Sequence, residues 1–137
     1  MKETRILREV SVINLSDDHA DLTVCNFINE HFPIERLYYI SNVLPGKSRG
    51  LHAHKELEQI FLALSGEFTL SVTDGKVTES VIVKSHGPGF FLPAGYWREL
   101  TKFSSNGICL VLASKKYDST DYISSFDDYK VWKNRNS

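Results

Sequence analysis

The chain has 137 residues, with 16 lysines and arginines against 17 aspartates and glutamates, so its formal net charge is −1. This length fits one domain, residues 1–137, which is large enough to bury a core without disulfide support. The near-balanced charge argues against a nucleic-acid partner, and no apolar run approaches the ~20 residues that cross a bilayer, so no membrane association is expected.

Most apolar residues fall in short runs that are typical of β-strands. The expected strands are, in chain order, residues 5–13, 22–28, 37–43, 59–64, 67–73, 77–83, 89–92 and 107–114. Asp74-Gly75 separates two of these runs and predicts a hairpin, because a type I′ turn needs positive φ at both central residues. About eight to ten short strands at this spacing predict an all-β fold with a closed barrel or a double sheet.

The C-terminal segment changes character and predicts a short helix over residues 124–135. Ser119-Thr120-Asp121 can cap a turn, and the serines at 124 and 125 can cap a helix that begins at Phe126. Its aromatic side chains recur at near-helical spacing, so we expect them to dock the helix on the barrel rather than to bind a cofactor.

The two cysteines, Cys25 and Cys109, both lie in apolar runs, and the sequence has no Cys-x-x-Cys motif. This pattern predicts buried free thiols in a reducing compartment. Residues 1–5 lack the apolar core of a signal peptide. We therefore expect the protein in the cytoplasm.

The densest polar cluster runs from Arg49 to Gln59 and reads RGLHAHKELEQ. On a strand, His52 and His54 point to the same side, because successive side chains alternate. Two imidazoles on one face beside Arg, Lys and Glu favour a functional site over a structural role.

Two spaced motifs are Gly46-x5-His52-x-His54-x3-Glu58 and Gly87-x5-Pro93-x-Gly95. They resemble motifs of the cupin superfamily, whose members are jelly-roll (double-stranded β-helix) barrels. The resemblance implies a jelly-roll barrel, in agreement with the fold expected from the strand pattern.

The same resemblance bears on metal binding. Metal-binding cupins have a third histidine where this chain has Arg98. A guanidinium has no lone pair to donate and would repel a dication, so we expect no metal. His52, His54 and Glu58 could still hold one. If no metal binds, Glu58 is either a remnant of an ancestral metal site or a hydrogen-bond partner for a histidine.

Five strings between about residues 36 and 129 carry a closer resemblance. They are Arg36-Leu37-Tyr38-Tyr39-Ile40, Arg49-Gly50-Leu51-His52-Ala53-His54-Lys55, Leu57-Glu58-Gln59, Trp97-Arg98-Glu99 and Leu112-Ala113-Ser114-x2-Tyr117-Asp118-x-Thr120-Asp121-Tyr122-Ile123. Together they resemble the dTDP-4-keto-6-deoxyhexose 3,4-ketoisomerases, the WxcM-like, metal-independent cupins. The family usually has Trp-His-Glu at residues 97–99, and an early Arg-Gly-x-Leu that this chain lacks.

The family reaction moves a carbonyl from C4 to C3 of a nucleotide-linked sugar through an enediol, without a cofactor. The resemblance implies that His52 carries the proton between the two carbons, a task suited to a group that titrates near neutral pH. It implies that His54 orients the sugar, assists the transfer or binds the enediol, and that Tyr38 handles the oxygen protons. Arg49 would polarise the carbonyl or bind the diphosphate.

The other expected substrate-binding residues could meet an anionic sugar nucleotide. They are Arg36, Lys55, Arg98, Trp97 and Gln59. Alternation places Arg36 on the face of Tyr38 and places Tyr39 on the other face, where packing is expected. Trp97 would face away from Arg98. It could stack on thymine, pack at a subunit contact or fill the core.

The resemblance implies a dTDP-linked 4-keto-6-deoxyhexose as substrate and a homodimer in which strands within residues 1–30 are exchanged. Three alternatives remain open, namely a metal-dependent cupin enzyme, a nucleotide-sugar 3,5-epimerase and a non-catalytic sugar-nucleotide-binding module. Metal content, product analysis by NMR and solvent deuterium incorporation distinguish them.

Overall fold

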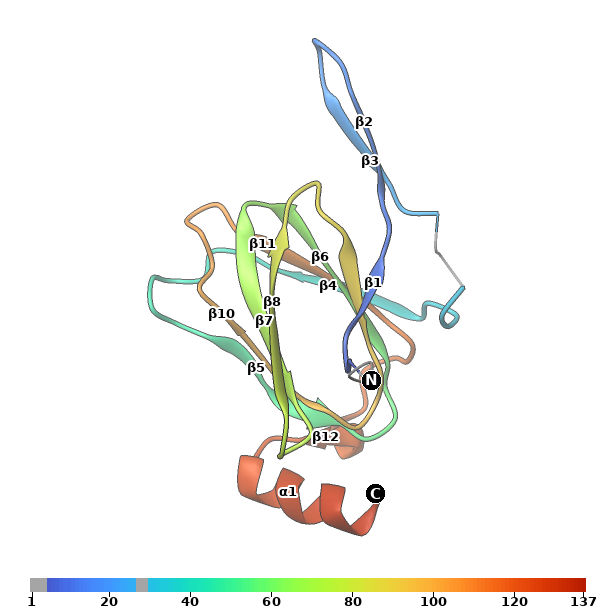
Figure 1. Ribbon diagram of the computed structural model, residues 1–137, viewed down its shortest axis with the longest axis vertical. Coiled ribbons are helices and arrows are strands. Elements are labelled where there is room, and N and C mark those ends of the chain that lie inside the picture. The colour runs from blue at the N-terminus through green and yellow to red at the C-terminus, as the bar shows by residue number, and fades with distance from the viewer. Residues whose placement is uncertain (1–4, 27–29) are drawn as a thin grey trace.

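The computed structural model describes residues 5–26 and 30–137, which hold twelve strands, a short 3-10 helix and one α-helix (Figure 1). In chain order the elements are β1 (Arg8–Val10), β2 (Ile13–Ser16), β3 (Asp21–Val24), β4 (Arg36–Ile40), β5 (Arg49–His54), β6 (Gln59–Ser65), β7 (Glu67–Thr73), β8 (Thr78–Lys84), β9 (Gly89–Leu92), β10 (Trp97–Thr101), β11 (Ile108–Ala113), η1 (Ser119–Asp121), β12 (Tyr122–Ile123) and α1 (Phe126–Arg135).

Two five-stranded antiparallel sheets enclose the core. Their strand orders are β1-β9-β6-β11-β4 and β12-β5-β10-β7-β8. Alternation along β7 buries Phe68, Leu70 and Val72, which pack in one cluster with Phe61 and Val111 of the other sheet. The predicted all-β, jelly-roll fold is confirmed.

The hairpin at Asp74-Gly75 is confirmed, but its turn differs from the two-residue type I′ form. Thr73 pairs with Thr78, which leaves four residues in the connection. Gly75 has a φ of 95°, whereas Asp74 lies outside the left-handed region. The Asp74 carboxylate accepts the N–H groups of Lys76 and Val77, both at 2.8 Å, and this loop-internal bonding favours the longer turn.

β5, β10 and β12 lie outside the expected apolar runs, and β2 shares only Ile13 with one of them. β5 and β10 contain several polar residues and β12 has only two residues, so a hydrophobic pattern alone does not identify these three strands. Pairing supplies the missing information, because β10 lies between β5 and β7, and β12 extends the sheet beyond β5. Three of the polar residues that interrupt the pattern, His52, His54 and Arg98, point into the barrel, as the next subsection describes.

The C-terminal helix is confirmed and closes one end of the barrel (Figure 1). Ser125 caps it by accepting a hydrogen bond from the Asp128 N–H at 3.3 Å. Tyr129 is fully buried, and its hydroxyl contacts the carbonyl oxygens of Thr73 at 3.1 Å and Gly95 at 2.9 Å. The aromatic stripe therefore docks the helix, as expected. No helix in the described ranges is long and apolar enough to span a membrane.

The N-terminal part has one segment inside the barrel and one outside it. Ile6 and Leu7 lie in the core, and their N–H groups bond to the carboxylate of Glu79. The β2–β3 hairpin projects away from the barrel at the end opposite α1 (Figure 1). It carries three exposed apolar side chains, Ile13, Leu15 and Leu22. Part of the predicted strand 22–28 lies outside the described residues.

Cys25 is half-buried and Cys109 is buried, and both are free thiols. Burial raises the pKa of the Cys109 thiol to about 12, so it stays protonated and inert at neutral pH.

Candidate active site

An open cavity of about 880 Å³ lies on the side of the barrel formed by β4, β5, β10 and β12. The loop between β4 and β5 forms its rim. The lining residues are Arg36, Tyr38, Tyr39, Ile40, Ser41, Asn42, Val43, Leu44, Lys47, Ser48, Arg49, Gly50, His52, Arg98 and Tyr122. Its size falls in the range that holds a small-molecule ligand, and four of its lining residues are arginine or lysine.

The two histidines of β5 meet inside the barrel. Alternation on the strand puts them on one face, and their Nε2 atoms lie 3.1 Å apart. His52 is half-buried and lines the cavity, whereas His54 is 3% exposed and lies outside the cavity lining. The Tyr122 ring packs on both, with centroids 4.8 Å from His52 and 4.3 Å from His54. The prediction that the imidazoles share a face is confirmed.

Arg98 joins this pair from β10, where it is the register partner of His52. Its Nη2 group donates to the Tyr38 hydroxyl at 2.9 Å and to His52 Nε2 at 3.0 Å. The side chain is only 2% exposed, and its Nε and Nη1 atoms are buried without a hydrogen-bond partner. No acidic side chain in the described ranges pairs with this cation.

A buried, unpaired cation is costly, and the structure leaves Arg98 in that condition next to an open cavity. Gly50 makes the close approach possible, because a Cβ there would lie 2.2 Å from Arg98 Nη1. The arrangement fits a negative charge that arrives with a ligand or develops during a reaction.

The Tyr38 hydroxyl is held by two donors. It accepts from Arg98 and from the amide of Gln59, whose Nε2 lies 3.0 Å away. With both oxygen lone pairs engaged, the hydroxyl hydrogen remains to donate to a ligand. Gln59 is 1% exposed, so it supports Tyr38 from the barrel interior rather than from the cavity lining. Arg36 covers the Tyr38 ring, with its Cζ 4.8 Å from the centroid, as strand alternation predicts.

Burial and neighbouring cations keep both histidines neutral. Burial, together with Arg98 and Arg36, lowers the pKa of His52 from 6.5 to about 3. Burial, Arg98, His52 and Arg36 lower the pKa of His54 to about 2. An arginine can only donate, so His52 Nε2 must offer its lone pair to Arg98. His52 is therefore in the form that can take up a proton at neutral pH.

Asp121 contacts the site from η1 and was not among the predicted site residues. It is 8% exposed, and its carboxylate accepts the N–H groups of Glu56 at 2.8 Å and Leu57 at 3.2 Å. Its Oδ2 also lies 3.4 Å from His54 Nδ1, at an ion-pair distance rather than in a well-formed hydrogen bond. Asp121 lies within one of the family-like strings, but spacing alone does not indicate contact with a distant strand.

The structure brings seven of the nine predicted site residues together. Arg36, Tyr38, Arg49, His52 and Arg98 line the cavity, while His54 and Gln59 lie directly behind it. The exposed Arg49 side chain is at the rim, where β5 begins.

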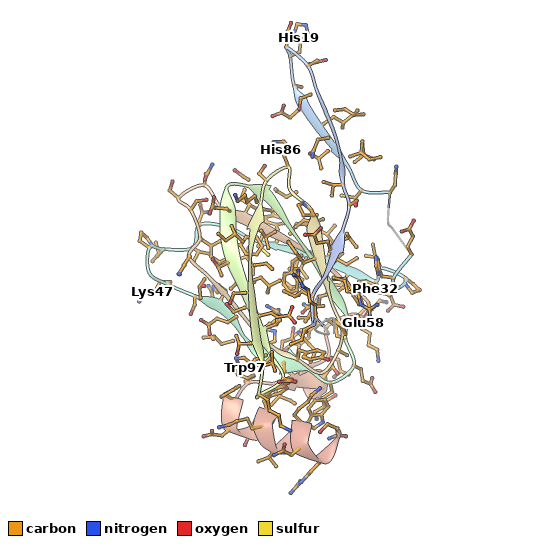
Figure 2. All side chains as sticks on the ribbon, in the orientation of Figure 1. His19, Phe32, Lys47, Glu58, His86 and Trp97 are labelled. Carbon is orange, nitrogen blue, oxygen red and sulfur yellow. The ribbon has the colours of Figure 1, made fainter. Side chains whose placement is uncertain are left out.

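Lys55 and Trp97 lie outside this group. Lys55 is exposed just beyond the end of β5 and does not line the cavity. Trp97 is 9% exposed, and its ring packs 5.3 Å from Phe126 and 6.0 Å from Tyr129. Figure 2 shows it beside α1, away from Lys47 on the cavity rim. Strand alternation turns Trp97 into the core beneath the helix, which is one of the three placements expected for it, and a substrate-binding role for Trp97 stays a prediction.

Tyr39 also differs from its expectation of packing. It lies on the edge strand β4, on the face opposite Tyr38, is 64% exposed and also lines the cavity.

The alternative metal-ligand set is not assembled. Within residues 5–26 and 30–137, no three His, Cys, Asp or Glu side chains gather in a group that could hold a metal ion. Glu58 precedes β6 and lies on the other side of the barrel from Lys47 in Figure 2. The first residue of β6, Gln59, is the one that reaches Tyr38. Strand alternation therefore assigns the inward position to an amide instead of the carboxylate.

Comparison with known proteins identifies the family. Residues 5–134 match the FdtA family, described as WxcM-like, C-terminal. The chain belongs to this family. A TDP-4-oxo-6-deoxy-α-D-glucose-3,4-oxoisomerase from Aneurinibacillus thermoaerophilus is 38% identical over 104 residues, which cover 76% of this chain and 75% of the relative. The resemblance stated from the sequence motifs is confirmed.

Solved structures agree with this assignment. A 3,4-ketoisomerase from Helicobacter canadensis superposes with a TM-score of 0.86 at 32% identity and covers 93% of this chain and 97% of its own. A mutant of the 3,4-ketoisomerase QdtA from Thermoanaerobacterium thermosaccharolyticum, in complex with TDP-4-keto-6-deoxyglucose, has a TM-score of 0.89 at 28% identity and covers 97% of each chain. The likeness therefore extends over nearly the whole of each chain.

Proposed function

We propose that this protein is a 3,4-ketoisomerase of dTDP-4-keto-6-deoxyglucose, which moves the sugar carbonyl from C4 to C3. One observation carries the proposal. Among the described residues, Arg98 is a buried cation without an acidic partner, and it bonds to both Tyr38 and the neutral His52 at a cavity that can hold a ligand. A base, a hydroxyl donor and a cation in contact are what an enolisation needs.

The proposed reaction begins with removal of the proton on C3, which is acidic because it is α to the C4 ketone. His52 takes this proton at Nε2, whose lone pair exchanges its hydrogen bond from Arg98 for the new N–H bond, and the C–H electron pair forms the C3–C4 double bond. The C4 carbonyl pair moves to its oxygen, which receives the Tyr38 proton to give the enediol. The Arg98 guanidinium stabilises the negative charge as it develops on oxygen.

The second half reverses these roles across the double bond. Tyr38, now a phenolate held by Arg98 and Gln59, takes the proton of the C3 hydroxyl, and the C3 carbonyl forms. His52 returns its proton to C4. No net proton is gained or lost, so the two residues end in their starting states.

Cations at the cavity support the choice of a sugar nucleotide as ligand. Arg36, Lys47 and Arg49 line it together with Arg98. Guanidinium groups can bind phosphate oxygens through two parallel hydrogen bonds, so Arg36 and Arg49 suit a diphosphate. The 3-keto product is a substrate class for an aminotransferase, which fits a role in making dTDP-linked 3-amino deoxysugars. The free thiols support the expected cytoplasmic location.

We also propose a homodimer that exchanges N-terminal strands within residues 1–30. The β2–β3 hairpin extends from the barrel, and its Ile13, Leu15 and Leu22 are 45–56% exposed. Leu37 and Tyr39 on the outer face of β4 are also exposed and could meet a second chain. Light scattering at micromolar concentration should give twice the chain mass, and a monomer would contradict the proposal.

The test of function is incubation with dTDP-4-keto-6-deoxyglucose in deuterated water, followed by NMR of the sugar. We expect a 3-keto product with deuterium at the migrated position. Inversion at C3 or C5 with the carbonyl still at C4 would indicate an epimerase, and binding without exchange would indicate a non-catalytic module. Turnover that a chelator abolishes would favour the metal-dependent alternative.

The His52→Asn variant tests whether His52 is the base in this reaction. It should still bind TDP but lose turnover by about a hundredfold or more, as expected for removal of an acid–base group. His86→Asn is the matched control, because His86 is exposed on the loop before β9 (Figure 2). A loss of only a few-fold in His52→Asn would contradict its assignment as the base.

A further inference from the structure

We propose that Asp121 is a positioning residue that holds His54 in the Nδ1–H tautomer, so that His54 Nε2 faces His52 as a hydrogen-bond acceptor. His54 then shares the proton that His52 takes from the substrate. This inference rests on the proposed ketoisomerase function and adds to it a residue that does not reach the substrate cavity.

The orientation of Asp121 is fixed by backbone groups. Its Oδ1 accepts the Glu56 N–H and its Oδ2 accepts the Leu57 N–H, both in the turn that follows β5. These bonds hold Oδ2 at 3.4 Å from His54 Nδ1, with both side chains buried. An ionised carboxylate can only accept hydrogen bonds, so it favours a proton on the nitrogen that faces it.

The number of hydrogen-bond donors that face His52 Nε2 then decides between the two tautomers of His54. Arg98 already donates to His52 Nε2, and His54 Nε2 lies 3.1 Å from the same atom. If His54 carried its proton on Nε2, it would compete with Arg98 for the single lone pair of His52 Nε2 and would keep that lone pair from the substrate when Arg98 releases it. Its bare Nδ1 would also face the carboxylate, an unfavourable contact.

With the proton on His54 Nδ1, the His54 Nε2 lone pair faces His52 and does not compete with Arg98 for the lone pair of His52 Nε2. When a proton enters from C3, the His52 lone pair exchanges its hydrogen bond from Arg98 for an N–H bond, and that N–H donates to His54 Nε2, so both imidazoles stabilise the proton. When the proton leaves for C4, the pair returns to its starting state. Asp121 therefore strengthens the base without gaining or losing a proton itself.

The experiment combines kinetics with ¹⁵N NMR of histidine-labelled protein, which distinguishes a protonated ring nitrogen from a bare one. The His54 signals are assigned with His54→Gln. In the wild-type protein we expect His54 to be protonated at Nδ1. In Asp121→Asn we expect the Nε2–H tautomer to gain population, and kcat to fall about 10- to 100-fold with little change in TDP affinity.

Asp118→Asn is the control. It makes the same carboxyl-to-amide change in the same turn, but Asp118 is exposed, and its carboxylate accepts hydrogen bonds from the N–H and hydroxyl of Thr120. It should leave both the His54 tautomer and kcat unchanged.

The outcomes separate a positioning role from a structural one. If Asp121 only ties down the turn at Glu56 and Leu57, its variant will melt at a lower temperature but keep the tautomer and the kcat of the folded enzyme, which overturns the inference. An Nε2–H tautomer in the wild-type protein also overturns it and needs no variant to fold. A wild-type protein that does not convert the sugar refutes the proposed function instead, and the NMR result then still decides whether Asp121 sets the tautomer.

Discussion

Gly50→Ala tests whether the exact placement of the Arg98 guanidinium matters. Gly50 lies on β5 with a φ of 68°, and an added Cβ would lie 2.2 Å from Arg98 Nη1 and 3.2 Å from Cζ. Contacts this short cannot persist, so the guanidinium must move. Arg98 is buried, and its displacement breaks the bonds from Nη2 to Tyr38 and His52.

Two effects of this substitution can be separated. A residue with a Cβ in the left-handed region costs about 1–2 kcal/mol, which for a domain of this size lowers the melting temperature by about 3–8 °C. Gly46→Ala should cost the same, because Gly46 has a φ of 75°, yet a Cβ there meets nothing within 4 Å. Only Gly50→Ala should also lose catalysis, by about a hundredfold or more in kcat, as expected when one stabilising donor leaves a developing oxyanion.

The assay is kcat and KM for carbonyl migration, together with thermal unfolding, for both alanine variants. Comparable melting temperatures with a selective loss of kcat in Gly50→Ala would support the role of Arg98. Equal kcat values for the two variants would refute the reasoning, because they would mean that the guanidinium does not need its present position.

Three further predictions follow from the site and the core. Tyr38→Phe should lower kcat by about a hundredfold or more but keep TDP binding, and unchanged turnover would exclude Tyr38 from proton transfer. Burial lowers the pKa of His54 from 6.5 to about 2, so between these pH values the unfolded chain binds a proton at His54 that the native state does not bind. Urea denaturation should therefore give a free energy of unfolding about 2 kcal/mol lower at pH 5 than at neutral pH from His54 alone. The His54→Gln variant should lack this part of the pH dependence. Trp97→Ala should lower the free energy of unfolding by about 3–5 kcal/mol, while the folded protein keeps its affinity for TDP. A loss of TDP affinity without a loss of stability would instead support a substrate-binding role for Trp97.

Strand alternation accounts for what could be predicted of the site. It correctly placed His52 beside His54, and Arg36 beside Tyr38. The cupin-like spacing correctly turned Arg98 inward. These are local relations, since each depends only on the parity of residues along one strand or on a motif within it.

Relations between strands could not be predicted in the same way. The motif spacing pointed to Glu58, but β6 begins one residue later and directs Gln59 at Tyr38. Alternation predicted that Trp97 faces away from Arg98 but not that α1 would cover it. The contact of Asp121 with His54 joins η1 to the end of β5, and it exists only because β12 pairs with that strand.

The electrostatics of the site explain why it combines a strong cation with neutral bases. Arg98 lowers the pKa of both histidines, so they remain unprotonated and able to accept a proton. The same cation weakens their affinity for that proton, which favours its return to carbon. When negative charge develops on the sugar oxygen, it partly neutralises the guanidinium, so the field that opposes protonation of His52 weakens while the proton is being transferred. The affinity of His52 for a proton would therefore rise as negative charge develops on the sugar oxygen, because Arg98 interacts with both groups.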